Sequence, residues 1–89
     1  MFKVRFKATA DKKLSKLPKN IQIRIIHKLE FFVQSSDPLL YAEPLTNLKI
    51  GTYRFRIGNY RVVFDMVEEA EANIIMILDI GHRKDIYRR

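Results

Sequence analysis

Residues 53–64 read YRFRIGNYRVVF, and this stretch decides the fold. The dipeptide Gly58-Asn59 divides it into two runs of aromatic, β-branched and basic residues. A Gly-Asn pair between two such runs is a strong signal for a two-residue turn in a β-hairpin. We therefore predict strands over residues 53–57 and 60–67, with Arg56 directly opposite Arg61.

The predicted register separates the hairpin side chains into two faces, because residues directly opposite one another project to the same side of a sheet. One face is apolar and suited to contact helices; it carries Tyr53, Phe55, Ile57, Tyr60, Val62 and Phe64. The other face carries Arg54, Arg56 and Arg61. Two arginines directly opposite each other repel, so this pair lowers stability unless an anion lies between them.

Two interpretations of the arginine face stay open at this point. Either the arginines extend into water and keep one face of the sheet soluble, or they bind phosphate. A guanidinium group can hold two phosphate oxygens through parallel hydrogen bonds and stays charged at any relevant pH. An acidic segment of a partner protein would suit the same surface, and the residues alone do not choose between these anions.

The sequence before the hairpin predicts one strand and two helices. Residues 2–7 alternate apolar and basic side chains, which is typical of a half-buried strand. We expect a short helix with Thr9 as its N-cap, followed by an amphipathic helix over residues 19–34, where apolar residues recur every three or four positions. Residues 37–51 contain two prolines and no clear period, and they predict a connecting loop.

After the hairpin, residues 73–80 predict a third, very apolar strand. The chain therefore predicts an α+β fold: an N-terminal strand, a helical hairpin and a three-stranded antiparallel run, with both helices on one face of a twisted sheet. We expect a single domain over residues 1–89, because this length supports one hydrophobic core.

Composition excludes several classes of function. The 89 residues include 17 Lys and Arg against 10 Asp and Glu, giving a net charge of +7, and no Cys. The lack of Cys excludes disulfide scaffolds, Cys-ligated zinc and thiol catalysis, and two histidines are too few for a His-based metal site, so we expect no metal and no cofactor. No apolar run is long enough to span a membrane. We expect a cytoplasmic protein whose partner is anionic.

The nine C-terminal residues, GHRKDIYRR, follow the third strand directly. Whether they form a helical turn or an extended segment, Arg83 and Tyr87 can point the same way. A tyrosine beside arginines can stack on a base or exchange a proton, although a tyrosine near a chain end can also be an ordinary anchor. His82 is likewise open between a surface histidine and a catalytic one.

Residues 53–64 and 81–88 together resemble the RelE/ParE superfamily of toxins from type II toxin–antitoxin modules. The shared features are a basic-x-basic pair, Gly-x-Tyr-Arg and His-Arg-x-x-x-Tyr at this spacing. The segment 14–18 and the pair Leu45 and Leu48 fit the same pattern, so the resemblance covers nearly the whole chain. Its implied catalytic residues are Arg56, Arg61, Arg83 and Tyr87. Its implied RNA- or phosphate-binding residues are Lys49, Arg54, His82 and Lys84.

RelE-type members of this superfamily imply a metal-free, ribosome-dependent endoribonuclease that cleaves mRNA by attack of a 2′-OH on the adjacent phosphate. ParE-type members inhibit DNA gyrase instead and tend to lack the terminal tyrosine, so Tyr87 favours the ribonuclease. A non-catalytic relative that only binds antitoxin is the third alternative. The expected partners are an acidic, helical antitoxin in a hetero-oligomer and the ribosome with its mRNA; we expect no membrane partner.

One difference from the family concerns Arg54 and Arg56, because some RelE-type nucleases have lysines at these positions. A lysine whose pKa is lowered can transfer a proton, whereas an arginine effectively cannot. Substrate binding by these residues therefore carries over more securely than acid–base roles. His82 is the only imidazole nearby, and we keep it as an alternative general acid or base.

Overall fold

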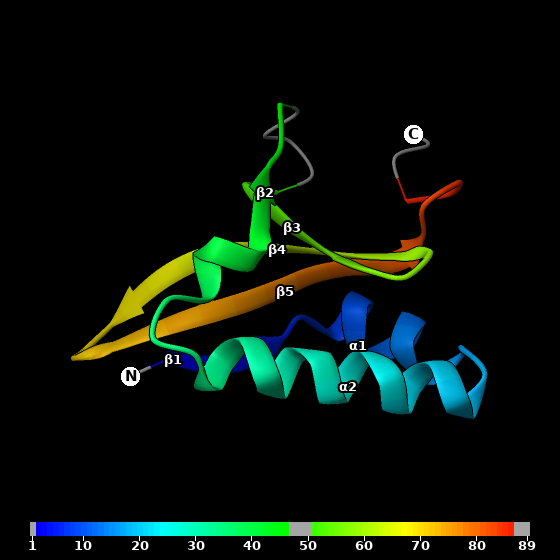
Figure 1. Ribbon diagram of the computed structural model, residues 1–89, viewed down its shortest axis with the longest axis horizontal. Helices are drawn as coiled ribbons and strands as arrows, with labels where there is room; N and C mark the ends of the chain where they lie inside the picture. Colours follow the sequence, from blue (N-terminus) through cyan, green and yellow to red (C-terminus); the bar gives the residue numbers. More distant parts are fainter. Residues whose placement is uncertain (1, 47–50, 87–89) are drawn as a thin grey trace.

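The computed structural model describes residues 2–46 and 51–86, which form two α-helices and one five-stranded sheet (Figure 1). The elements in chain order are β1 (Phe2–Phe6), α1 (Ala8–Ser15), α2 (Lys19–Gln34), the 3-10 helix η1 (Pro38–Tyr41), β2 (Ala42–Pro44), β3 (Tyr53–Ile57), β4 (Tyr60–Glu69) and β5 (Ala72–His82). The strand order is β1-β5-β4-β3-β2, in which β1 runs parallel to β5 and the other neighbours are antiparallel. The predicted α+β fold is confirmed.

Both helices lie on the same face of the sheet, as predicted (Figure 1). The longer helix, α2, has the predicted bounds and buries Ile25, Leu29 and Phe32, which are spaced at four and three residues along one side. The shorter helix begins one residue before Thr9, so the predicted Thr9 cap is wrong. The N–H of Lys7 still pairs with the carbonyl of Ile77, which carries the sheet pairing up to the residue before the helix.

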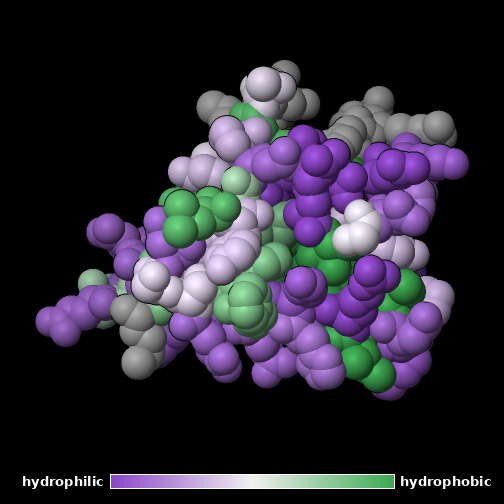
Figure 2. Space-filling view, viewed as in Figure 1, coloured by the Kyte–Doolittle hydropathy of each residue, from purple (hydrophilic) through white to green (hydrophobic). Residues whose placement is uncertain are grey.

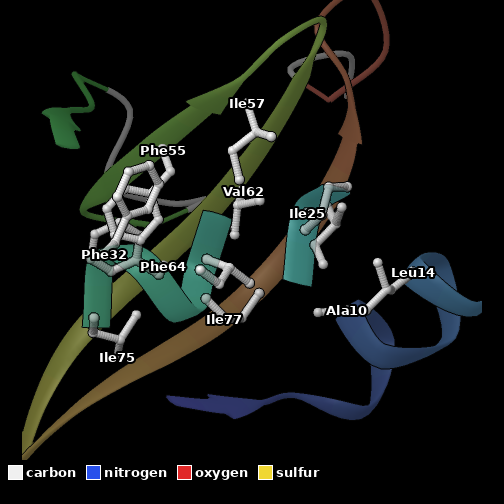
Figure 3. Close-up of a cluster of buried hydrophobic side chains, with 12 residues drawn as sticks. Ala10, Leu14, Ile25, Phe32, Phe55, Ile57, Val62, Phe64, Ile75 and Ile77 are labelled. Carbon is white, nitrogen blue, oxygen red and sulfur yellow. The ribbon is translucent and has the colours of Figure 1, made fainter. Parts of the chain in front are cut away.

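The core lies between the two helices and the apolar face of the sheet formed by β3, β4 and β5 (Figure 3). Its centre is a row of aromatic rings: Phe55 stacks on Phe64 at 4.4 Å between ring centroids and contacts Phe32 of α2 at 4.5 Å. Ile57 and Val62 continue this face toward the turn. The alternation of the hairpin sequence therefore aims its apolar side chains at the helices, as the two-residue periodicity of a strand requires.

The predicted loop over residues 37–51 contains regular structure, which corrects that prediction. Asp37 caps η1 by accepting a hydrogen bond from the N–H of Leu39 at 3.2 Å, and β2 then pairs antiparallel with β3. A three-residue edge strand that ends in proline is too short to show a two-residue period in the sequence. This strand forms only through its pairing with β3, and the pairing places Glu43 opposite Arg54.

The sheet face that points away from the helices is partly covered by the chain before β3. Val63 is fully buried there, and a Cβ on Gly51 would overlap the Cγ1 methyl group of Val63, so this position requires glycine. Thr52 anchors the same segment, because its N–H and hydroxyl both donate to Asp65 Oδ1, at 2.8 and 2.7 Å. The arginine face is therefore confined to the end of the hairpin near its turn.

Candidate functional site

The turn of the β3–β4 hairpin adopts the predicted two-residue geometry. Ile57 lies opposite Tyr60 and Arg56 opposite Arg61, which confirms the predicted register. Gly58 has a φ of 60° and Asn59 keeps a negative φ, as in a type II′ turn, which takes glycine at its first central position. We use the name hairpin tip for residues 56–61.

Arg61 lies at the hairpin tip but is buried, with only 6% of its surface exposed. Its Nη1 donates hydrogen bonds to the carbonyl of Gly58 at 3.0 Å and to the carbonyl of Tyr60 at 2.9 Å. Hydrogen bonds from a charged donor are stronger than those between neutral groups, so the guanidinium holds the turn in place. The sequence did not show this burial, because the register fixed only the side of the sheet on which Arg61 lies.

Arg54 and Arg56 share one carboxylate across the edge of the sheet. The Nε of Arg54 lies 3.1 Å from Glu43 Oε1, and the Nε of Arg56 lies 3.3 Å from the same oxygen. The Arg56 side chain is 58% exposed and that of Arg54 is 25% exposed. Glu43 lies in the segment predicted as a loop, and a lone glutamate carries no sequence pattern that would mark it as the partner of these arginines.

The C-terminal segment folds back onto the hairpin tip. The N–H of Arg83 donates to the carbonyl of Asn59 at 2.8 Å, and the N–H groups of Asp85 and Ile86 both donate to the carbonyl of His82. Ile86 is buried against Gly81 and holds this turn to the body of the protein. The exposed side chains of Arg83 and Lys84 therefore project from a fixed backbone beside the tip.

His82 is oriented by two contacts. Its Nδ1 accepts a hydrogen bond from the N–H of Lys84 at 3.1 Å, and its ring meets that of Tyr60 edge-on, with 5.5 Å between the centroids. Because Nδ1 is an acceptor here, the neutral imidazole carries its proton on Nε2 and presents a donor at that position. This tautomer presents an N–H donor that can bind an anion.

A cleft of about 500 Å³ lies beside the C-terminal segment, between α1 and the end of β5. Its lining includes Lys13, Lys16, Tyr60 and His82. Lys13 Nζ is held 2.6 Å from Oδ1 of the buried Asp79, so one of the two lysines is already engaged by a carboxylate. Within residues 2–46 and 51–86, no three His, Asp or Glu side chains are grouped so as to hold a metal ion, and no helix is long and apolar enough to cross a membrane.

Residues 4–87 match the family described as ParE toxin of type II toxin-antitoxin system, parDE. The chain belongs to the RelE/ParE superfamily of type II toxins. It is similar to Toxin RelG of Mycobacterium tuberculosis, with 36% identity over 88 residues that cover 99% of this chain and 98% of that protein.

Two solved structures of toxin–antitoxin complexes resemble this toxin. The first is the RelBE2 complex of Mycobacterium tuberculosis, with a TM-score of 0.68, 33% identity and coverage of 91% of this chain and 96% of that one. The second is the RelB–RelE complex of Methanococcus jannaschii, with a TM-score of 0.60, 27% identity and coverage of 92% and 93%. Both likenesses extend over nearly the whole fold described above.

The fold of this toxin brings six of the eight predicted site residues to one end of the sheet. Five of them lie at or beside the hairpin tip or on the adjoining C-terminal segment: Arg56, Arg61, His82, Arg83 and Lys84. Arg54 lies two residues further along β3 and is joined to Arg56 through Glu43. Tyr87 and Lys49 lie outside the described residues.

Proposed function

We propose that this toxin is an endoribonuclease that cleaves mRNA on the ribosome. The observation that carries this proposal is the hairpin tip, where the exposed cations of Arg56 and Arg83 stand on a backbone that Arg61 and the Arg83 N–H hold in place. Guanidinium donors carried on a fixed backbone suit a phosphate that gains charge during reaction. We also propose that the toxin acts in the cytoplasm and binds a cognate acidic antitoxin, as the relatives in the two solved complexes bind theirs.

The proposed reaction is attack of a ribose 2′-OH on the adjacent phosphate. The new O–P bond forms at the 2′ oxygen, the bond to the 5′ oxygen breaks, and one proton leaves the 2′ oxygen while another reaches the 5′ oxygen. Arg56 and Arg83 stabilise the pentacoordinate phosphate, and Arg61 acts as a positioning residue for the turn. Arginine does not exchange protons, so the two proton transfers are left to His82 and Tyr87. His82 protonates the leaving oxygen as the imidazolium, because neutral imidazole that gave up its Nε2 proton would become an unstable anion.

A second candidate function is inhibition of DNA gyrase, because the matching family is described by its ParE members. The two functions differ in which nucleic acid is cleaved first in the cell, mRNA or DNA. We expect expression of the toxin to produce new 5′ ends in mRNA within minutes, in register with codons, before any change in DNA. Intact transcripts together with gyrase-linked DNA breaks would instead establish the second function.

Replacing Glu43 with glutamine is expected to tighten RNA binding by about three- to tenfold. The substitution removes the carboxylate shared by Arg54 and Arg56 and with it a negative charge that a phosphate at this edge must approach. Glu43 is 42% exposed in both ion pairs, and ion pairs open to solvent contribute about 0–1 kcal/mol, so the unfolding temperature should change little. Binding is measured by fluorescence anisotropy with an RNA in which 2′-O-methyl groups block cleavage.

Glu69→Gln is the matched control for this experiment. It also removes one exposed carboxylate from an ion pair with an arginine, Arg5, but on β4 at the opposite end from the hairpin tip. An equal gain in affinity from both variants would show that net charge alone controls binding, and it would count against a phosphate site at Arg54 and Arg56.

A further inference from the structure

The side of α2 that faces Gly58 and η1 carries a hollow of about 350 Å³ that the proposed reaction does not use. It is lined by Arg24, His27, Lys28 and Phe31, and we call it the α2 groove. These residues are spaced at three and four positions, so the helix brings them to one side. The groove thus combines two permanent cations, an imidazole and an aromatic ring on one rigid element.

The charge of the α2 groove is uncompensated by its surroundings. Its lining has no carboxylate, and across residues 2–46 and 51–86 neither Arg24 nor Lys28 forms an ion pair. Glu30, the single acidic residue of α2, lines a neighbouring hollow on the other side of His27. A groove with this charge is complementary to an anion.

The aromatic part of the groove is exposed to solvent. Phe31 is 55% exposed, and its ring meets the ring of Tyr41 in η1 at 5.6 Å between centroids; Tyr41 is 44% exposed. Lys28 Nζ lies 5.7 Å from the centre of the Phe31 ring, a distance typical of a cation–π contact. Figure 2 shows hydrophobic surface over this part of α2 and η1, bordered by hydrophilic side chains. An exposed ring beside cations is the usual platform for an unstacked base.

The groove is continuous with the hairpin tip through Arg24. The Cζ, Nη1 and Nη2 atoms of Arg24 each lie 3.3 Å from the position that a Cβ on Gly58 would occupy, so the guanidinium plane lies over this glycine. Arg61 binds the carbonyl of the same Gly58, and Arg83 binds that of Asn59. An RNA strand bound at the hairpin tip could therefore continue past Arg24 without crossing an acidic side chain of the groove.

We infer that the α2 groove binds the single-stranded message that flanks the cleavage site, with phosphates on Arg24 and Lys28 and a base stacked on Phe31. This inference rests on the proposed ribonuclease function for the identity of the strand. Continuity with the tip favours the message over ribosomal RNA. The exposed ring favours RNA over an acidic protein segment, since charge alone would not require it.

The test is binding of two fluorescein-labelled RNAs, of 4 and 12 nucleotides, whose 2′-O-methyl groups prevent cleavage. We expect Arg24→Gln combined with Lys28→Gln to weaken binding of the 12-mer at least about tenfold. The slope of the logarithm of the binding constant against the logarithm of the salt concentration should become less negative by about 1.4, the value for two lost phosphate contacts on a single strand. The 4-mer, which is too short to extend beyond the tip, should be affected less than threefold. Phe31→Leu should weaken the 12-mer at least about fivefold by removing the stacking ring.

The matched control is Lys3→Gln combined with Lys12→Gln, which lowers the net charge equally on β1 and α1. Equal losses in both double variants, or equal losses for the two RNA lengths, would overturn the inference. So would unchanged binding by Phe31→Leu together with displacement of the RNA by a glutamate-rich peptide of matched charge, or normal 12-mer binding with loss of binding to whole ribosomes. Because the probes cannot be cleaved, a failure of the proposed nuclease activity leaves this result unaffected and is detected separately.

Discussion

Replacing Arg83 with alanine should lower the rate of mRNA cleavage by about 100- to 1000-fold while leaving the fold intact. In the proposed reaction the guanidinium of Arg83 faces the developing phosphate charge, and loss of one such preorganised donor typically has an effect of this size. The fold should survive because the contact of Arg83 with the hairpin tip is made by its backbone N–H, which alanine retains. Cleavage of a reporter message by purified ribosomes and toxin gives the rate, and thermal unfolding checks the fold.

The matched control is Lys12→Ala, which removes an exposed cation on α1. It should change the rate less than threefold, since it alters only the general positive field. Full cleavage activity in Arg83→Ala would exclude this residue from the site. If the wild-type toxin leaves the message intact under these conditions, the gyrase hypothesis becomes the one to test.

Replacing Arg61 with alanine should lower the free energy of unfolding by about 2–3 kcal/mol. The turn would lose two hydrogen bonds from a charged donor, and a hydrogen bond to a charged group contributes about 1.5–3 kcal/mol. For a domain of this size, such a loss lowers the unfolding temperature by about 10–20 °C. Urea titration followed by circular dichroism measures the free energy directly.

Arg56→Ala provides the control on the opposite strand. Arg56 lies directly across the ladder from Arg61 but is exposed, so its loss should change the free energy of unfolding by less than about 1 kcal/mol. Equal stability of wild type and Arg61→Ala would show that the turn does not depend on this guanidinium. The contrast also matters for function, because a loss of toxicity in Arg61→Ala reports damage to the turn as well as to any phosphate contact.

The hairpin shows how far sequence reasoning extends in this chain. A two-residue turn fixes the register of its strands, so Gly58-Asn59 was enough to predict that Arg56 lies opposite Arg61. The register does not determine how deeply each side chain is buried, however. Arg61 is paired on both sides, with Arg56 of β3 and Gly81 of β5, and is 6% exposed. Arg56 lies beyond the three residues of β3 that pair with β2, and its side chain is 58% exposed.

Contacts at the edge of the sheet could not be predicted from the sequence in this way. Glu43 and Arg24 both lie outside the hairpin in the sequence, and neither belongs to a recognisable motif. Glu43 reaches Arg54 and Arg56 only because β2 pairs with β3, and Arg24 reaches Gly58 only because α2 packs across the hairpin. Such long-range contacts depend on the completed fold, so no local pattern reports them.

The sequence by itself determined the α+β class, the bounds of α2, the turn and register of the hairpin, and the superfamily. These properties depend on local periodicity, turn chemistry and the spacing of a few residues, all of which can be identified in the sequence. Only the tertiary structure decided which arginines are exposed, which carboxylate lies among them, and how α2 joins the hairpin tip. The burial of a side chain and its partners depend on which other segments of the chain lie next to it. Those neighbours are determined only when distant parts of the chain pack together.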